Sequence, residues 1–265
     1  MVPCRVEQMN LRIGGVPYGV GAPLLAGMEE DSGVHLVKEP PTSLIEALRA
    51  GRLDAALVSS IEAVRRPGYR IAAGLGIASR SEVRSVRAFR RPGPIRLVGL
   101  DAGSATSAAL LRVLLRGPRR SCVEGEPAFE PIRPTRKPAE LPHDLVMLIG
   151  DAGLTADAGD REVWDMGLEW RTWTGLPFVF ALWLIRPGAD AGAVLSVLRR
   201  ARARGRKRRE VDGTFGAVHY DLDDADVMGL RRFWAEAAAL GLAENAISPQ
   251  FVGAETPPAS MDEPG

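Results

Sequence analysis

Cysteine and histidine are scarce in this chain of 265 residues, and their positions exclude several kinds of site. Cys4 and Cys122 are too few for a disulfide framework or a cysteine-built zinc site, which favours a reducing compartment. His35, His143 and His219 lie far apart and lack the spacing of metal ligands. The chain also lacks a GxGxxG segment, a Walker loop and a GxSxG elbow. Redox chemistry, phosphoryl transfer and serine hydrolysis therefore lose most of their sequence support.

Long apolar runs and an excess of charge of one sign are absent as well. No uncharged apolar stretch approaches the roughly 20 residues that span a bilayer, and the N-terminal segment MVPCRVEQMN lacks the apolar core of a signal peptide. The formal net charge is +1, so the field of the whole molecule does not favour a polyanionic partner. We therefore expect a cytoplasmic protein that neither enters a membrane nor binds nucleic acid.

One local run of positive charge departs from this balance. The absence of interleaved aromatic side chains favours the solvated end of a helix over a surface that stacks nucleic-acid bases. The basic residues of this run are Arg199, Arg200, Arg202, Arg204, Arg206, Lys207, Arg208 and Arg209.

Short apolar runs alternate with helical patterns along the chain. The runs at 11–17, 53–60 and 95–101 are typical of buried strands that end at polar loops. A helix is predicted from Ser43, which begins a capping box, to Gly51, which fits a C-terminal glycine cap. This alternation predicts an α/β fold. Further strands are expected at 69–79, 83–91, 144–152 and 177–185, and further helices at 107–116, 163–175, 190–204 and 223–240.

The order of these elements predicts two lobes, each a mixed sheet flanked by helices. The Pro-Gly-Pro break at 92–94 marks the expected crossing between them. Residues 10–91 together with 182–252 are expected to form lobe 1, and residues 92–181 lobe 2. Residues 253–265 are expected to be a disordered tail.

Small polar residues follow the predicted strands, at the edge where an α/β sheet opens on a cleft. Ser60 ends one strand, and Ser104, Thr106 and Ser107 lie between the strand at 95–101 and the next helix. Unpaired N–H groups at a helix N-terminus carry positive potential, so these three residues could hold a carboxylate. The alternative interpretation is that one of them only caps the helix.

Six segments, taken in order, carry a resemblance to a known family. They resemble the chorismate dehydratases of the futalosine pathway of menaquinone biosynthesis, over about residues 10 to 252. The dihydroxynaphthoate synthases of the same pathway share the fold and are the nearest alternative. The segments are RLDAALVSSIE, GIASRSEVRSVRAF, GLDAGSATSAALLRVLL, MLIGDAGL, DMGLEWRTWTGLPFVFALW and LRRFWAEAAALGL.

The resemblance implies a type II periplasmic-binding-protein-like fold that holds a small carboxylate in the cleft between its lobes. It also implies an enzyme that removes water from chorismate to give 3-[(1-carboxyvinyl)oxy]benzoate, with neither a metal nor an organic cofactor. The substrate's own enolpyruvyl carboxylate has been proposed as the base in this family. The protein's part is then mainly to hold both carboxylates and align the reacting groups.

The resemblance also indicates which residues form the site. Ser85 and Thr106 are the leading hydrogen-bond donors to the ligand. The resemblance leaves the oligomeric state open. By motif position, catalysis is assigned to Ser85 and Tyr18, and substrate binding to Ser60, Ser104, Thr106, Ser107, Gly150 and Asp151. Asp151 either faces the cleft or caps the next turn.

The first loop departs from the family pattern. Its segment PYGVGAPLL has Val20 where the family has an asparagine considered important for catalysis, and Ala22 where the family has a lysine. A valine side chain forms no hydrogen bond, and loss of one preorganised donor can cost about two to three powers of ten in rate. Three hypotheses remain: an active dehydratase, an enzyme of the same fold on another carboxylate, and a non-catalytic binding protein for a small anion.

Overall fold

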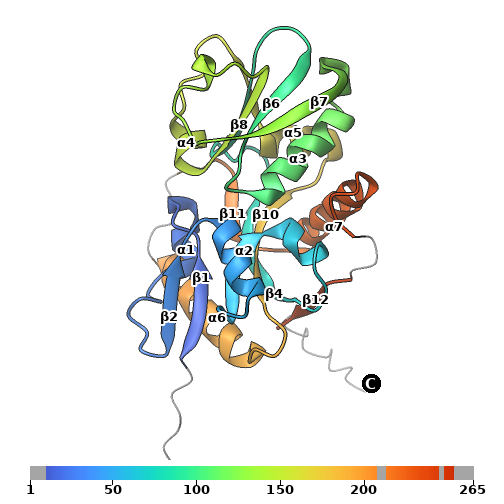
Figure 1. The fold of residues 1–265 in the computed structure, drawn as a ribbon. Helices are drawn as coiled ribbons and strands as arrows, with labels where there is room; N and C mark the ends of the chain where they lie inside the picture. Colours follow the sequence, from blue (N-terminus) through green and yellow to red (C-terminus); the bar gives the residue numbers. More distant parts are fainter. Residues whose placement is uncertain (1–9, 208–212, 245–247, 254–265) are drawn as a thin grey trace, which may run out of the picture.

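The computed structural model describes residues 10–207, 213–244 and 248–253, and the side chain of Lys207 is left out of that description. Figure 1 shows two α/β lobes, one above the other, each built around its own sheet. The mixed α/β architecture with two sheets confirms the expected fold class. The expected tail at 253–265 lies outside the described residues, apart from Gly253.

The first lobe contains a seven-stranded sheet with the order β11-β4-β10-β3-β1-β2, and β12 pairs with β4. Strand β1 is parallel to β2 and β3, whereas β10 is antiparallel to β3 and β4. The strands are β1 (Leu11–Gly15), β2 (Val34–Lys38), β3 (Ala55–Ser59), β4 (Arg70–Ser79), β10 (Phe178–Ile185), β11 (Val218–Asp221) and β12 (Gln250–Val252).

The second lobe contains a five-stranded sheet with the order β7-β6-β8-β5-β9. Strand β6 is parallel to β7 and β8, and β5 is antiparallel to β8 and β9. The strands are β5 (Val86–Arg90), β6 (Ile95–Asp101), β7 (Val123–Ile132), β8 (Leu145–Ile149) and β9 (Glu162–Asp165).

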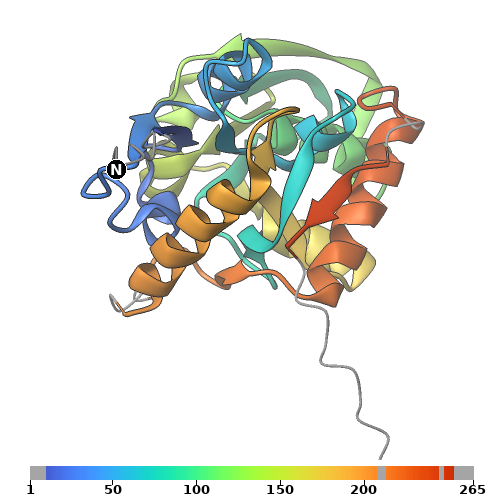
Figure 2. The ribbon, with the colours of Figure 1, turned by 90° about the horizontal axis from the view of Figure 1, so that it is seen from below.

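Helices cover both sheets, and the two long C-terminal helices pack on the first lobe, as the sequence predicted. Figure 2 shows α6 and α7 on either side of β4 and β12. The α-helices are α1 (Ala22–Leu25), α2 (Pro41–Arg49), α3 (Ala105–Arg116), α4 (Gly150–Thr155), α5 (Met166–Thr174), α6 (Ala191–Lys207) and α7 (Asp224–Ala239). The 3-10 helices are η1 (Gly19–Gly21), η2 (Ser60–Val64), η3 (Arg120–Cys122) and η4 (Pro138–Glu140).

The two lobes share one core. Buried apolar side chains of both sheets form a continuous cluster. An edge-to-face aromatic group joins three elements within it: the ring of Phe178 on β10 lies 5.3 Å from Trp170 on α5 and 4.9 Å from Phe233 on α7. The aromatic side chains Phe178, Phe180 and Trp183 of this strand are therefore core residues. Because α5 follows the second sheet and α7 covers the first, these contacts also fix the lobes to each other.

The lobe boundaries differ from those expected at residues 91 and 182. Strand β5 pairs with β8 and β9, so the chain enters the second sheet between Ser79 and Val86, before the Pro-Gly-Pro break. It returns to the first sheet at Phe178, where β10 begins. Backbone pairing decides the assignment, and a turn between two strands of one sheet looks the same in sequence as a crossing between lobes.

Two local predictions were wrong as well. Helix α2 begins at Pro41, and its N-cap Pro40 makes no side-chain bond, so Ser43 does not begin a capping box. Proline suits the first helical position because its fixed φ is already helical and it has no N–H to leave unpaired. The predicted helix at 163–175 divides into strand β9 and helix α5, which meet at Asp165.

The basic run on α6 is engaged with other parts of the chain. Arg200 lies 2.8 Å from the Asp31 carboxylate, and Arg202 lies 2.7 Å from that of Asp221. These ion pairs offset part of the positive charge within the protein itself. Residues 208–209 of the run lie outside the described residues.

Candidate functional site

A cavity that is open to solvent at its mouth lies between the two sheets. Both lobes contribute to its wall, which is what a ligand site of the expected fold requires. Of the eight residues that the sequence indicated, five line it: Tyr18, Ser85, Ser104, Ser107 and Gly150. Ser60, Thr106 and Asp151 do not.

Three serine hydroxyls form one side of the cavity at the start of α3. Ser104 is the N-cap of this helix, and its Oγ accepts hydrogen bonds from the backbone N–H of Ser107 at 3.2 Å and from the Ser107 hydroxyl at 3.0 Å. The hydroxyl of Ser59, at the end of β3, lies 3.5 Å from the same oxygen. The capping interpretation therefore holds for Ser104, and the positive end of the α3 dipole faces this group of hydroxyls.

Ser85 is held in place by a carboxylate that the sequence analysis missed. Asp165 accepts hydrogen bonds from the backbone N–H groups of Val83 at 2.9 Å and Arg84 at 2.7 Å, and it also caps α5. Arg84 has a φ of 55°, a conformation that a non-glycine residue keeps only when its surroundings impose it. The Asp165 clamp therefore fixes the backbone next to Ser85. The position of Asp165 directly before a helix is a capping signal in the sequence. Its hydrogen bond from Val83, however, joins residues that are 82 positions apart.

Tyr18 crosses from the first lobe to the second. A Cβ atom at Gly150 would lie 3.1 Å from Cδ1 of the Tyr18 ring, so the ring packs directly on the Gly150 backbone. Gly150 also has a φ of 58°, which suits glycine. Burial raises the pKa of the Tyr18 phenol, and the nearby carboxylates of Asp101 and Asp151 raise it further. Tyr18 is therefore a neutral hydrogen-bond donor at physiological pH.

Asp101 is a second carboxylate that the sequence analysis missed. Its side chain is buried at the end of β6, and it accepts backbone hydrogen bonds from Gly103 at 2.9 Å and Ile149 at 3.4 Å. Burial raises the pKa of Asp101 although both bonds favour the charged form. The sequence signal that could have identified Asp101 is an acidic residue at the carboxyl end of a buried strand. Asp101 braces the turn that leads into α3.

Ser60 and Thr106, which the sequence assigned to substrate binding, form a buried seam between the lobes and do not line the interlobe cavity. The Ser60 hydroxyl donates to the Val179 carbonyl at 2.7 Å and lies 3.2 Å from Thr106 Oγ1. Thr106 Oγ1 accepts the backbone N–H of Ile61 at 3.1 Å. Both side chains are fully buried. Residues three apart share a helix face, so Ser104 and Ser107 point to the cavity together while Thr106 points elsewhere.

Asp151 also differs from its assignment as a cleft residue. It is exposed in the first turn of α4, where an acidic side chain suits the helix dipole. Its contribution to the site is a charge near Tyr18.

Most of the cavity wall is apolar, and the polar side chains among the residues that line it carry hydroxyl groups rather than formal positive charge. Among the described residues, no lysine or arginine lines it. Val20, at the position of the family asparagine, is 9% exposed and lines the wall. In the part of the chain that the structure describes, no group of three or more His, Cys, Asp or Glu side chains is placed to hold a metal ion. An anion in this cavity would be bound by hydroxyl groups and the end of α3.

Known proteins resemble this chain in sequence and in fold. A family model described as menaquinone biosynthesis matches residues 11–212. The protein belongs to this menaquinone biosynthesis family. A similar protein, the chorismate dehydratase of Thermus thermophilus, is 29% identical over an alignment 277 residues long that covers 85% of this chain and 96% of that protein. The recognised resemblance is thereby confirmed at the level of the family.

Solved structures confirm the periplasmic-binding-protein-like fold of this menaquinone biosynthesis family member. Protein AF1704 of Archaeoglobus fulgidus has a TM-score of 0.59 at 16% identity, covering 88% of this chain and 98% of its own. The CA3427 product of Candida albicans, described as having the generic periplasmic binding protein fold, has a TM-score of 0.53 at 13% identity, with coverages of 87% and 90%. The aliphatic sulphonate binding protein SsuA of Escherichia coli has a TM-score of 0.50 at 17% identity, with coverages of 89% and 94%. Within the described residues, no helix is both long and apolar enough to cross a bilayer.

Proposed function

We propose that the protein is a chorismate dehydratase that forms 3-[(1-carboxyvinyl)oxy]benzoate on the futalosine route of menaquinone biosynthesis, in the cytoplasm. The observation that carries the proposal is the interlobe cavity, where Tyr18, Ser85 and the capped start of α3 converge in a member of this family. The dehydratase of Thermus thermophilus, which aligns along most of both chains, supports the choice of reaction.

The reaction needs positioning more than a strong protein base. Elimination breaks a ring C–H bond and the bond to the ring hydroxyl, forms a double bond and releases water, and the product gains an aromatic ring. We assign the proton transfer to the substrate's own enolpyruvyl carboxylate. Among the described residues, no histidine or lysine lines the cavity to act as a base. The protein then supplies alignment and hydrogen bonds.

Tyr18 is assigned to the leaving hydroxyl. Its raised pKa keeps the phenol protonated, and a neutral O–H can donate to an oxygen that gains negative charge as the C–O bond breaks. Tyr18 lies two residues from Val20, so it can replace the amide that the family has at that position. Ser85, Ser104 and Ser107 are assigned to the substrate carboxylates, because their hydroxyls line the cavity at the positive end of the α3 dipole.

The first loop favours one alternative, a non-catalytic or divergent binder of a small carboxylate, including one like the 1,4-dihydroxy-6-naphthoate synthases. Val20 lines the cavity with an apolar side chain, and Ala22 brings no charge to the start of α1. A site that only binds an anion needs neither the asparagine nor the lysine of the dehydratases.

The test is to incubate the protein with chorismate and separate the products by chromatography, against a blank for spontaneous breakdown. We expect 3-[(1-carboxyvinyl)oxy]benzoate above the blank, and about 10-fold to 100-fold less with Tyr18→Phe. Tyr220→Phe is the matched control. The Tyr220 hydroxyl is buried without a hydrogen-bond partner among the described residues, and burial raises its pKa to about 12. Its removal should leave the rate unchanged.

The other outcomes separate the alternatives. No product, with chorismate still raising the unfolding temperature, would indicate a binding protein. The absence of both product and thermal protection would contradict chorismate as the ligand. The search would then turn to other carboxylates.

A further inference from the structure

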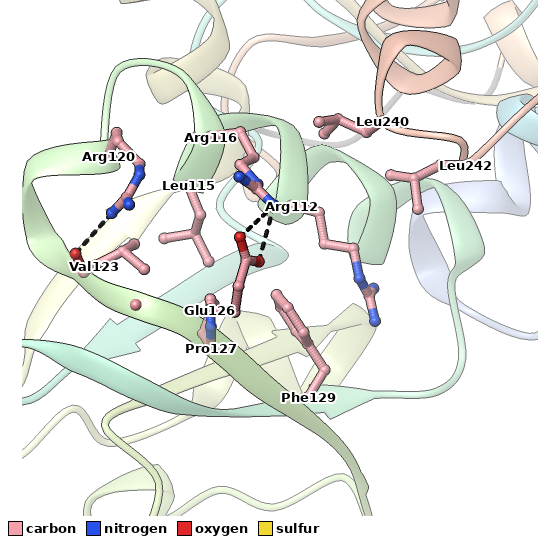
Figure 3. Close-up of a pocket in the computed structure, with 11 residues that line it drawn as sticks. Arg112, Leu115, Arg116, Arg120, Val123, Glu126, Pro127, Phe129, Leu240 and Leu242 are labelled. Carbon is pink, nitrogen blue, oxygen red and sulfur yellow. Dashed lines mark hydrogen bonds and ion pairs between the residues drawn. The ribbon is translucent and has the colours of Figure 1, made fainter.

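A second cavity, also open to solvent, lies between α3, β7 and the segment that follows α7. Figure 3 shows its wall, in which apolar side chains alternate with arginines. Leu115 and Phe129 come from the second lobe, and Leu240 and Leu242 from the first. The cavity therefore joins both lobes, outside the interlobe site.

All three arginines of the cavity contact other parts of the protein, but among the described residues only Arg116 pairs with a carboxylate. Arg116 pairs with Glu126 through contacts of 2.7 and 2.8 Å, so the Glu126 carboxylate is already neutralised. Arg120 donates to the carbonyl of Val123 at 2.8 Å, which directs its side chain along the rim but leaves its charge unpaired. Both contacts are drawn in Figure 3.

Arg112 differs from Arg120 because its unpaired charge is partly buried rather than exposed. Its guanidinium lies 4.0 Å from the centre of the Phe129 ring and donates to the Ala108 carbonyl at 3.3 Å. Across the described part of the chain, no carboxylate forms an ion pair with it. Burial and the nearby charge of Arg65 lower the pKa of Arg112. A half-buried cation beside a second cation is unfavourable unless an anion compensates it.

We propose that this cavity binds a small carboxylate with an apolar body, the carboxylate on Arg112 and the body against Leu115, Phe129 and Leu242. The planar guanidinium fork suits a carboxylate, and the apolar side chains of the wall disfavour ligands with a polar body such as nucleotides. This inference rests on the second cavity alone and is independent of the proposed reaction.

Occupation of this site should stabilise the packing of the lobes. A ligand between Phe129 on β7 and Leu242 after α7 contacts both of them. Arg65 of the first lobe already donates to the Leu242 carbonyl at 3.0 Å, so the wall on that side is fixed before the ligand binds. Binding that occurs only in the folded state raises the unfolding temperature.

The experiment is calorimetric titration of the full chain with 2-naphthoate and, separately, with octanoate. We expect saturable binding at one site for at least one of the two probes, and the tighter probe distinguishes an aromatic from an acyl body. Arg112→Gln should weaken this binding between about 10-fold and 100-fold, the range for loss of a charged hydrogen bond. Arg112→Lys keeps the positive charge but loses the planar fork, so it should weaken binding less than Arg112→Gln does.

Two control variants show where the probe binds. Arg80→Gln alters an exposed arginine that pairs with Asp223 on the first lobe, and it should leave the affinity unchanged. Val20→Asp places a carboxylate in the interlobe cavity and should also leave it unchanged. Absence of saturable binding by either probe would overturn the proposal. So would binding that Val20→Asp weakens while Arg112→Gln does not.

Discussion

Replacing Thr106 with valine should destabilise the junction between the lobes by about 2 kcal/mol. Because the Ser60 hydroxyl donates to the Val179 carbonyl, the Thr106 hydroxyl is left to donate to Ser60 Oγ and to accept the N–H of Ile61. Valine has nearly the same shape but removes both bonds. It leaves the Ile61 N–H buried without a partner, and such a loss costs about 1 to 3 kcal/mol.

Thr106→Ser is the matched control, because it keeps the hydroxyl and loses only a methyl group, at a cost of about 1 kcal/mol. Thermal unfolding measures both variants. A loss of about 2 kcal/mol lowers the midpoint of a chain of this size by about 4 to 8 °C. Ligand affinity, measured by calorimetry well below the midpoint, should change little because Thr106 does not line the interlobe cavity. The reasoning is refuted if Thr106→Val is as stable as Thr106→Ser, or if it stays stable while ligand affinity falls sharply.

Three further predictions concern other parts of the site and its support. Val20→Asn should raise dehydratase turnover in the chorismate assay, and no rise would mean that the first loop is built for another reaction. Asp165→Asn should lower the unfolding temperature and weaken ligand binding in calorimetry, because the clamp beside Ser85 loses acceptors; unchanged affinity would contradict a positioning role. Burial acts to raise the pKa of Asp221, but hydrogen bonds from Arg202 and Arg206 hold it at about 2, below the ordinary 3.8. This depressed pKa stabilises the fold above pH 3.8 and the stabilisation is lost as pH falls towards 2. Because the Asp221 side chain is 45% exposed, solvent screening reduces the stabilisation to about 1 kcal/mol. Asp221→Asn should therefore lower the unfolding temperature at pH 6 but make no difference near pH 2, and a difference that stays constant with pH would contradict the ion-pair explanation.

Local patterns predicted the elements better than they predicted which residues meet. The strand at 95–101, the polar turn and the following helix were found because apolar runs and caps act over a few residues. Gly51 was correctly expected at the end of α2, and its φ is 70°. The boundary between the lobes was missed because the pairing of β5 with β8 depends on residues about 60 positions apart.

The same limit applies to the site: local motifs indicated residues that line the cavity, but not the residues that hold them in place. Tyr18, Ser85 and Ser104 were placed in the cavity by motif position. The roles of Asp101 and Asp165 depend on partners that only the folded chain brings near, since Asp165 accepts N–H groups 82 residues away. Thr106 does not line the cavity, and helical spacing alone would have separated it from Ser104 and Ser107.

The contact of Tyr18 with Gly150 limits how the site can evolve. Because the lobes share a core and a hydrogen-bonded seam, we expect a ligand to enter and leave by movement of the short loop that carries Tyr18. The same side chain then touches the ligand and controls its residence time. A substitution at this position would change turnover and release together, so new specificities should arise first at Val20, which lines the wall without crossing between the lobes.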